Sequence, residues 1–162
     1  QPVEYNIGID LKAAQVVFNH SSISIWQVPR DSYRQTIVSL AELKHKMNEE
    51  GVLANYLLSK LDELLIKADG KLGETYVMGD NPLTLLSVLQ TSWEKDPASS
   101  EYVIKRAPLI SNDGTYNTHA SSRNIRVYRR LDTRLMFEDF FAKVAIFDKN
   151  AASKKIPMHN PH

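Results

Sequence analysis

The chain has 162 residues, of which 43% are hydrophobic and 24% charged, and its formal net charge is +1. This composition is typical of one soluble globular domain with a sizeable core, and it favours neither nucleic acid nor an anionic membrane as a partner. There is no cysteine, which excludes disulfides, thiolate metal sites and cysteine nucleophiles, and no apolar run approaches the length of a membrane span.

The first thirty residues predict a strand, a helix and a second strand. Residues 3–9, "VEYNIGI", predict a short β-strand that ends at Asp10. Asp10 is a predicted N-cap for a helix over residues 11–20, because an aspartate before an apolar-periodic run satisfies the first free N–H groups. The aromatic and β-branched run at 23–29, "ISIWQVP", predicts the second strand. This order is typical of a βαβ unit in a parallel sheet.

Two helices are predicted next, over residues 31–51 and 52–70. The first begins at a capping Asp31, and the second carries a broad leucine stripe that ends near Gly70. We expect them to form an αα-hairpin packed on the sheet, with the leucine stripe in the core.

The second half predicts a strand at 74–78 and a helix that opens at Asn81-Pro82. Two further strands, at 101–110 and 123–131, predict a hairpin with an irregular connection at 119–122. A last helix is predicted over 132–147, with Asp132 as N-cap. We therefore expect one domain over residues 1–148 and a polar, loosely ordered tail over 149–162.

Three polar residues are candidates for a binding site. Glu4 and Asn6 lie two apart in the predicted first strand, so their side chains fall on one side of it. They either form the polar wall of a pocket that binds hydroxyl groups or are satisfied by a neighbouring loop or water. Asp80 follows a strand and precedes a helix, where a carboxylate either caps the helix or holds a hard cation such as Ca²⁺. His119, in a predicted loop, is a weaker candidate for a cleft residue.

The basic residues near the end of the chain alternate with apolar ones on a predicted strand. They indicate either a solvated face or a surface for an acidic partner. The residues are Arg123, Arg126, Arg129 and Arg130.

Several of these segments, in the same order, resemble the inosine-uridine-preferring nucleoside hydrolases. The stretch "VEYNIGIDLKAAQVVFNHSSISIWQVPRD" is similar to the family's segment that begins with Glu-Phe-Asn. "MGDNPLTLL" is similar to its His-Asp-Pro element, with Asp80 at the aspartate. The last strand and "LDTRLMFEDFF" are similar to its closing segment, so the resemblance covers nearly the whole chain except the tail.

The resemblance implies an α/β fold with a mostly parallel sheet flanked by helices, a β-hairpin and a C-terminal helix. It also implies a function, hydrolysis of the N-ribosyl bond of a nucleoside or related riboside by a Ca²⁺-bound water. Glu4 would then bind the ribose 5′-hydroxyl and Asn6 a second ribose hydroxyl. Asp80 would bind both Ca²⁺ and the ribose diol.

The chain departs from the family pattern at two places. The N-terminal aspartate cluster of the family, which supplies the general base and the other metal ligands, is absent. We therefore expect this chain to be an incomplete domain, the C-terminal half of a hydrolase. We expect the isolated chain to be inactive. Its expected partner is the N-terminal half of the same protein. The residue before Asp80 is Gly79, where the family often has a histidine that protonates the leaving base.

Two other functions remain open, a non-catalytic sugar- or nucleoside-binding relative and an α/β interaction module. A second copy of the chain is a further candidate partner. The sequence is that of a soluble protein, cytoplasmic or exported, and indicates no compartment.

Overall fold

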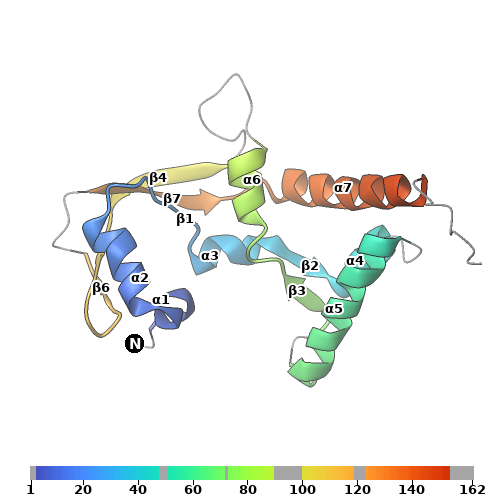
Figure 1. The fold of residues 1–162 in the computed structure, drawn as a ribbon, viewed down its shortest axis with the longest axis horizontal. Coiled ribbons are helices and arrows are strands. Elements are labelled where there is room, and N and C mark those ends of the chain that lie inside the picture. Colours follow the sequence, from blue (N-terminus) through green and yellow to red (C-terminus); the bar gives the residue numbers. More distant parts are fainter. Residues whose placement is uncertain (1–2, 48–50, 72, 90–99, 119–122, 154–162) are drawn as a thin grey trace, which may run out of the picture. The chain divides into compact units, whose positions relative to one another are not determined.

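The computed structural model describes residues 3–47, 51–71, 73–89, 100–118 and 123–153 (Figure 1). It confirms a mixed α/β protein with a long C-terminal helix. The chain divides into two compact units, each made of two separate stretches. Unit 1 comprises Gln1–Ser32 and Ser100–Arg130, and unit 2 comprises Tyr33–Ser99 and Leu131–His162.

Unit 1 begins with helices where a strand was predicted. Helix α1 spans Tyr5–Ile9 and α2 spans Leu11–Gln15, followed by a π-helical turn, η1, over Val16–His20. The strand prediction for residues 3–9 is wrong because the Glu4 carboxylate accepts a hydrogen bond from the Ile7 N–H (3.1 Å) and so caps a helix. The Asp10 cap is confirmed by a 2.9 Å bond from the Ala13 N–H to its Oδ1.

The sheet of unit 1 has the strand order β1-β7-β4. Strand β1 is Trp26–Gln27, β4 is Glu101–Arg106 and β7 is Asn124–Arg130. Strands β1 and β7 are parallel, whereas β4 and β7 have the predicted antiparallel pairing. The single strand predicted over 101–110 is wrong, because β4 ends at Arg106 and residues 109–110 belong to another two-stranded sheet. The expectation of a mostly parallel sheet is wrong, since three of the four strand pairs in the described ranges are antiparallel.

A small hairpin extends unit 1. Strands β5 (Leu109–Ile110) and β6 (Tyr116–Asn117) flank a turn in which Gly114 has φ +79°, a conformation that favours glycine. The side-chain amide of Asn19 both donates to the Ile110 carbonyl (2.9 Å) and accepts from the Ile110 N–H (2.8 Å). These two hydrogen bonds hold the β5–β6 hairpin against η1. The predicted irregular connection at 119–122 lies outside the described residues.

Unit 2 begins where a single helix over 31–51 was predicted. The structure has α3 (Arg30–Tyr33, its last residue in unit 2), a 3₁₀ turn η2 (Arg34–Thr36), strand β2 (Ile37–Ser39) and helix α4 (Leu40–Lys46). The long-helix prediction is wrong because β2 pairs antiparallel with β3 (Thr75–Val77). Strand β3 is distant from β2 in the sequence, so a local pattern does not show the pairing. Helix α4 starts only after β2, where the Ser39 side chain caps it by accepting a hydrogen bond from the Glu42 N–H (3.0 Å).

The other predicted helices of unit 2 are confirmed. Helix α5 spans Val52–Ala68, α6 spans Pro82–Val88 and α7 spans Thr133–Ser153, with Asp132 Oδ1 accepting from the Leu135 N–H (2.9 Å). Residues 149–153, expected in the tail, belong to α7, and the rest of the tail lies outside the described residues. Within the described ranges, no helix combines the length and apolar character that a bilayer crossing requires.

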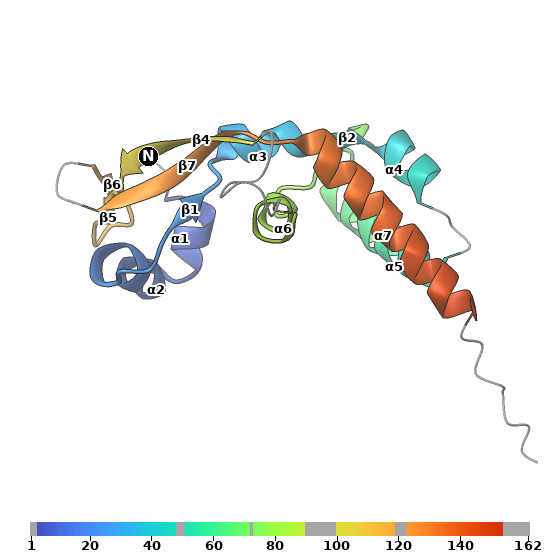
Figure 2. The same ribbon diagram turned by 90° about the horizontal axis from the view of Figure 1, so that it is seen from above.

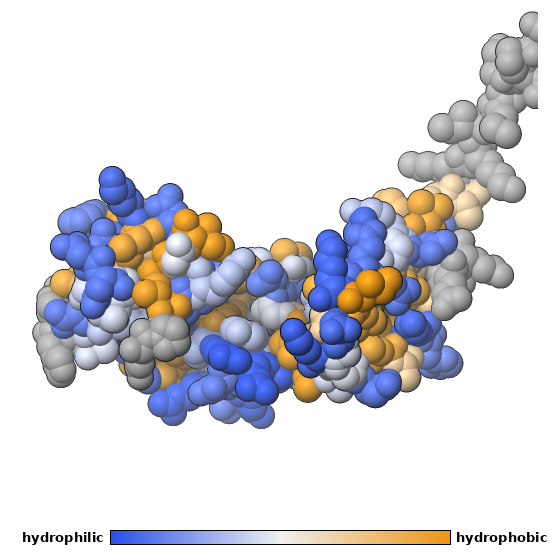
Figure 3. All heavy atoms as spheres, turned by 90° about the horizontal axis from the view of Figure 1, so that it is seen from below, coloured by the Kyte–Doolittle hydropathy of each residue, from blue (hydrophilic) through white to orange (hydrophobic). Residues whose placement is uncertain are grey.

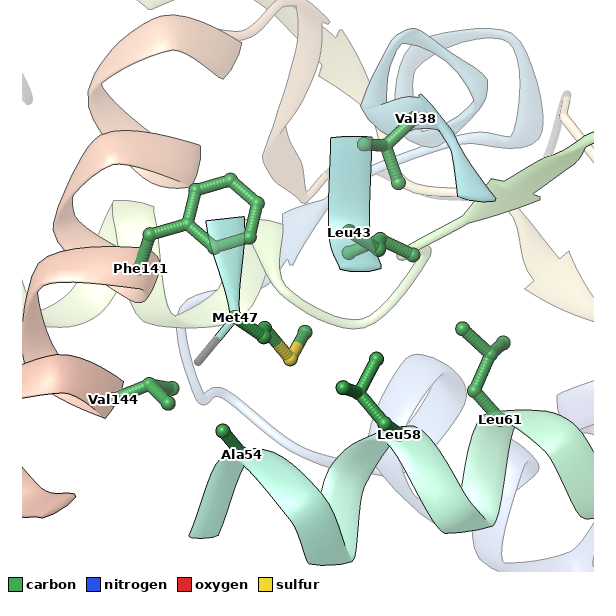
Figure 4. Packing of buried hydrophobic residues seen from close by; sticks show 8 residues of the cluster. All are labelled: Val38, Leu43, Met47, Ala54, Leu58, Leu61, Phe141 and Val144. Atoms are coloured by element: carbon green, nitrogen blue, oxygen red, sulfur yellow. The ribbon is translucent and has the colours of Figure 1, made fainter. Parts of the chain in front are cut away.

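The core of unit 2 joins β2, α4, α5 and α7. Figure 2 shows α5 and α7 next to each other, and Figure 4 shows side chains from all four elements pointing toward one another. Of the predicted leucine stripe on α5 (Leu53, Leu57, Leu61, Leu64 and Leu65), Leu61 is in this core, Leu53, Leu57 and Leu65 pack against it, and Leu64 is exposed. Leu58, outside the predicted stripe, is also in the core. The buried cluster is Val38, Leu43, Met47, Ala54, Leu58, Leu61, Phe141 and Val144.

Candidate functional site

Glu4 and Asn6 lie together on α1, although not on a strand as predicted. The Asn6 Nδ2 donates a 3.2 Å hydrogen bond to Glu4 Oε1, while Glu4 Oε2 accepts from the Ile7 N–H. Both side chains are exposed. Each carboxylate oxygen has two lone pairs and the amide has a second N–H. The pair therefore keeps donors and acceptors for a ligand hydroxyl while it also caps the helix.

Two residues that sequence reasoning missed lie beside this pair. Partial burial, and secondarily the Glu4 carboxylate, raise the pKa of the Tyr116 phenol, whereas hydrogen bonding with the Gln27 side chain acts in the opposite direction. No local pattern could have linked position 116 to position 4, because the link depends on how the β5–β6 hairpin packs.

Asp80 lies in an exposed turn between β3 and α6, in unit 2. It is not the N-cap of α6, which is Asn81, and Asn81 makes no side-chain cap bond. Within the described ranges, no hydrogen bond reaches the Asp80 carboxylate, while its backbone carbonyl accepts from the Leu83 N–H (3.1 Å). The carboxylate is thus available to solvent and to a ligand.

Tyr33 fills the space next to Gly79, the residue before Asp80. A Cβ at position 79 would lie 3.3 Å from the Tyr33 Cδ2. The segments that carry the two residues are joined by a 3.1 Å bond from the Met78 N–H to the Thr36 carbonyl, which extends the β2–β3 ladder. The Thr36 hydroxyl in turn donates to the Tyr33 carbonyl (2.6 Å). Position 79 therefore has little room for a side chain larger than glycine.

The structure brings Glu4 and Asn6 together within unit 1 and places Asp80 in unit 2. The resemblance implies that all three contact one ribose, and this stays a prediction. Ca²⁺ takes about six to eight oxygen ligands, and within the described ranges no group of three or more Asp, Glu or His side chains could hold a metal ion. The described residues alone therefore do not fit a Ca²⁺ site, and Asp80 offers one carboxylate toward it.

The other polar candidates have structural roles or lie outside the described residues. The Arg123 guanidinium donates to the carbonyls of Val17, Ser21 and Ile23, which ties the end of η1 to the sheet. The Arg126 guanidinium lies over the Trp26 ring, 4.8 Å from its centre. His119 is among the residues that the structure does not describe.

An apolar groove of about 330 Å³ lies within unit 2, against α5, α6 and α7. Its walls include Leu57, Leu85 and Phe140, and Phe147 at its border is 53% exposed. The ion pair between Lys143 and Asp139 (2.7 Å) also lies against it. Figure 3 shows that on the face seen from below, hydrophobic residues come to the surface between hydrophilic ones.

Comparisons of this chain with models of known protein families, with curated proteins and with solved structures gave no match.

Proposed function

We propose that this chain belongs to a nucleoside hydrolase-like N-glycosidase and carries part of its site. The observation that supports this best is the pairing of Glu4 with Asn6. Exposed carboxylate and amide groups held 3.2 Å apart can accept from and donate to neighbouring hydroxyls, which is the chemistry that a ribose requires. Asp80 is the proposed third contributor, an exposed carboxylate with no internal hydrogen bond in the described part of the chain.

In the proposed reaction, water replaces the base at C1′ of the ribose. The C1′–N bond breaks with its electron pair going to the base nitrogen, which takes up a proton, and the water oxygen forms the new C1′–O bond after losing a proton. Glu4 and Asn6 hold the sugar, so that their interactions position C1′ for attack. The general base and the remaining ligands for Ca²⁺ would come from residues outside this chain.

The test uses a longer form of the protein that includes the residues encoded upstream of Gln1. We expect it to release the base from inosine or uridine, or nitrophenol from p-nitrophenyl riboside. Glu4→Gln and Asp80→Asn should each lower kcat/KM by at least tenfold, since each removes a charge-assisted bond of about 1.5–3 kcal/mol. Asp62→Asn on the exposed side of α5 is the matched control. Activity that persists in both site variants would overturn the proposal.

An α/β interaction module is the second candidate, and the groove in unit 2 favours it. A partly exposed apolar groove beside an exposed Phe147 is the kind of surface that binds another protein. Ribose, nucleoside and Ca²⁺ titrations of the longer protein distinguish the candidates. If none of the three titrations detects binding, the result favours the interaction module.

A further inference from the structure

Strand β4 forms one edge of the sheet in unit 1. Within the described ranges β7 is the one strand that pairs with it, because β4 ends the strand order β1-β7-β4. Ile104 is 57% exposed, and Lys105 and Arg106 are exposed as well. An exposed edge of six residues is a template for pairing with another chain.

The register of the sheet shows which backbone groups of β4 point away from β7. The Ala107 N–H donates to the Arg123 carbonyl (2.8 Å), and Ile104 lies opposite Arg126 in the same register. In an antiparallel pair, hydrogen-bonded residues alternate with residues whose N–H and C=O groups point outward. The Arg126 N–H accordingly bonds the Ile25 carbonyl on the other side of β7 (3.1 Å). The backbone N–H and C=O of Ile104 therefore point to the open edge of the sheet.

The charges of β4 are arranged so that the strand complements a second copy of itself. The acidic Glu101 begins the strand, and the basic Lys105 and Arg106 end it, with three uncharged residues between. Charged side chains usually protect an edge strand from pairing with another copy. Here, antiparallel pairing of two copies about Val103 would place Glu101 of each copy opposite Lys105 of the other. Opposite charges in such cross-strand pairs stabilise a sheet.

Glu101 can take part in this pairing without losing its contact within the chain. Its Oε1 accepts from the Arg130 Nη2 (2.7 Å), and both side chains are exposed. An ionised carboxylate has about four acceptor positions, so it can also accept from a lysine of the second copy. Residues 101, 103 and 105 alternate along the strand and share one face of it. The charged pairs and the Val103 side chains would therefore lie on the same side of the joined sheet.

We propose that two copies of this chain dimerise through β4, paired antiparallel about a two-fold axis at Val103, so that the two unit 1 sheets become one continuous sheet. The outward N–H and C=O of Ile104 then bond to the second copy. The two-fold axis makes each contact occur twice, so one dimer has two Glu101–Lys105 pairs. The interface is small, and we expect a weak dimer whose population depends on protein concentration.

The first experiment tests the backbone pairing by sedimentation velocity, at protein concentrations up to the millimolar range. Ile104→Pro removes the N–H that points to the open edge but no hydrogen bond to β7, and proline is tolerated at such an edge position. Since one bond is lost in each copy, Kd should rise roughly five- to hundredfold. Ile104→Thr is the matched control, because threonine keeps the N–H and favours strands, and its Kd should change much less. Circular dichroism confirms that each variant folds.

The second experiment tests the charged pairs and the register. Glu101→Lys and Lys105→Glu each replace two attractive pairs with two repulsive ones, so each variant alone should have a Kd raised roughly two- to thirtyfold. When the two variants are mixed, every pair again joins opposite charges, and a heterodimer should form in preference to either homodimer. Lys67→Glu is the matched control, because it makes the same charge change on an exposed position of α5 in unit 2. It should form no preferred heterodimer with Glu101→Lys.

The outcomes decide the inference directly. A dimer that is weakened by Ile104→Pro and restored by mixing the two charge variants supports it. A chain that stays monomeric at millimolar concentration overturns it, and so does a dimer with equal Kd in Ile104→Pro and Ile104→Thr. Mixing that restores nothing overturns the register about Val103. None of these results depends on hydrolysis by the longer protein, because the pairing uses neither Glu4, Asn6 nor Asp80.

Discussion

The N-terminus of α5 is held by a side chain from α7, and breaking this link should destabilise unit 2. The Asp148 carboxylate, only 9% exposed, accepts hydrogen bonds from the Leu53 N–H (2.7 Å) and the Ala54 N–H (3.2 Å). Asp148→Ala would leave both backbone donors without a partner in a mostly buried place. Each such loss costs about 1–3 kcal/mol, and loss of a helix cap typically costs about 0.5–2 kcal/mol. We expect a total of about 2–4 kcal/mol.

Gly51 provides a second test of this link. Because glycine has no Cβ, the Asp148 carboxylate can occupy the space next to it. A Cβ at position 51 would overlap the Asp148 carboxylate, so Gly51→Ala should also destabilise unit 2. In the double variant, however, Asp148→Ala removes the Oδ2 and Cγ atoms that the new Cβ would overlap most, and leaves only the Asp148 Cβ, 2.9 Å away. The double variant should therefore be destabilised by less than the sum of the two single effects.

Thermal unfolding followed by circular dichroism measures these effects. For a chain of this size about 1 kcal/mol corresponds to roughly 2–4 °C, so Asp148→Ala should lower Tm by roughly 4–16 °C. Asp62→Ala, which removes an exposed carboxylate from α5, should stay within about 0.5 kcal/mol of the unmodified protein. Equal Tm values for these two variants, or strict additivity in the double variant, would refute the reasoning.

Four other outcomes are expected. Gly79→Ala should destabilise the protein by about 1 kcal/mol because its Cβ crowds the Tyr33 ring, and Tyr33→Ala should relieve that cost in a double variant measured by thermal unfolding. Arg123→Ala should cost about 1.5–3 kcal/mol in denaturant unfolding, because it removes a charged donor shared by three carbonyls. The hydrogen bond from Lys46 lowers the pKa of Glu138, so the pair stabilises the fold above the usual carboxyl pKa and loses this effect as pH falls through the lowered value. Glu138→Gln should flatten the dependence of Tm on pH in that acidic range. Calorimetry on this chain alone should detect no tight Ca²⁺ binding, because Asp80 offers a single carboxylate.

Each of these four predictions has its own control or contradicting result. Arg106→Ala removes an exposed arginine from the same sheet, and a loss equal to that of Arg123→Ala would contradict the role of Arg123. An unchanged Tm in Gly79→Ala would show that Tyr33 yields without cost. Salt should weaken the stabilisation by the Lys46–Glu138 pair, since both side chains are exposed. If Tm depends on pH in the same way in Glu138→Gln and in the unmodified protein, the pair makes no such contribution. Micromolar Ca²⁺ affinity would mean that the chain holds ligands beyond Asp80.

The parts of the fold that depend on local signals were predictable. Asp10 and Asp132 each cap the helix that follows, and Pro82 opens α6 as its position after Asn81 indicates. The runs at 101–110 and 123–131 correctly predicted two strands that pair antiparallel, although the first ends at Arg106. In each case the evidence lies within a few residues of the element, where a sequence pattern can be read directly.

The errors came from competing local and distant interactions. Residues 3–9 alternate like a strand, but Glu4 offers its carboxylate to the Ile7 N–H and so starts a helix. Residues 37–39 have helical spacing with their neighbours, yet their backbone pairs with β3, almost forty residues later. Glu4 and Asn6 are neighbours, as predicted, but at the start of a helix and not on one face of a strand.

The division of the chain has a consequence for synthesis on the ribosome. The polypeptide passes from unit 1 into unit 2, returns to unit 1 and ends in unit 2, so no single cut yields either unit whole. Phe141 and Val144 of the last helix complete a core whose other members are made nearly a hundred residues earlier, and Asp148 of the same helix caps α5. Until α7 emerges, Leu58 and Leu61 lack part of their cover and α5 lacks its cap. Nascent chains stalled before Thr133 should therefore expose this leucine surface to chaperones, and chains released after complete synthesis of α7 should not.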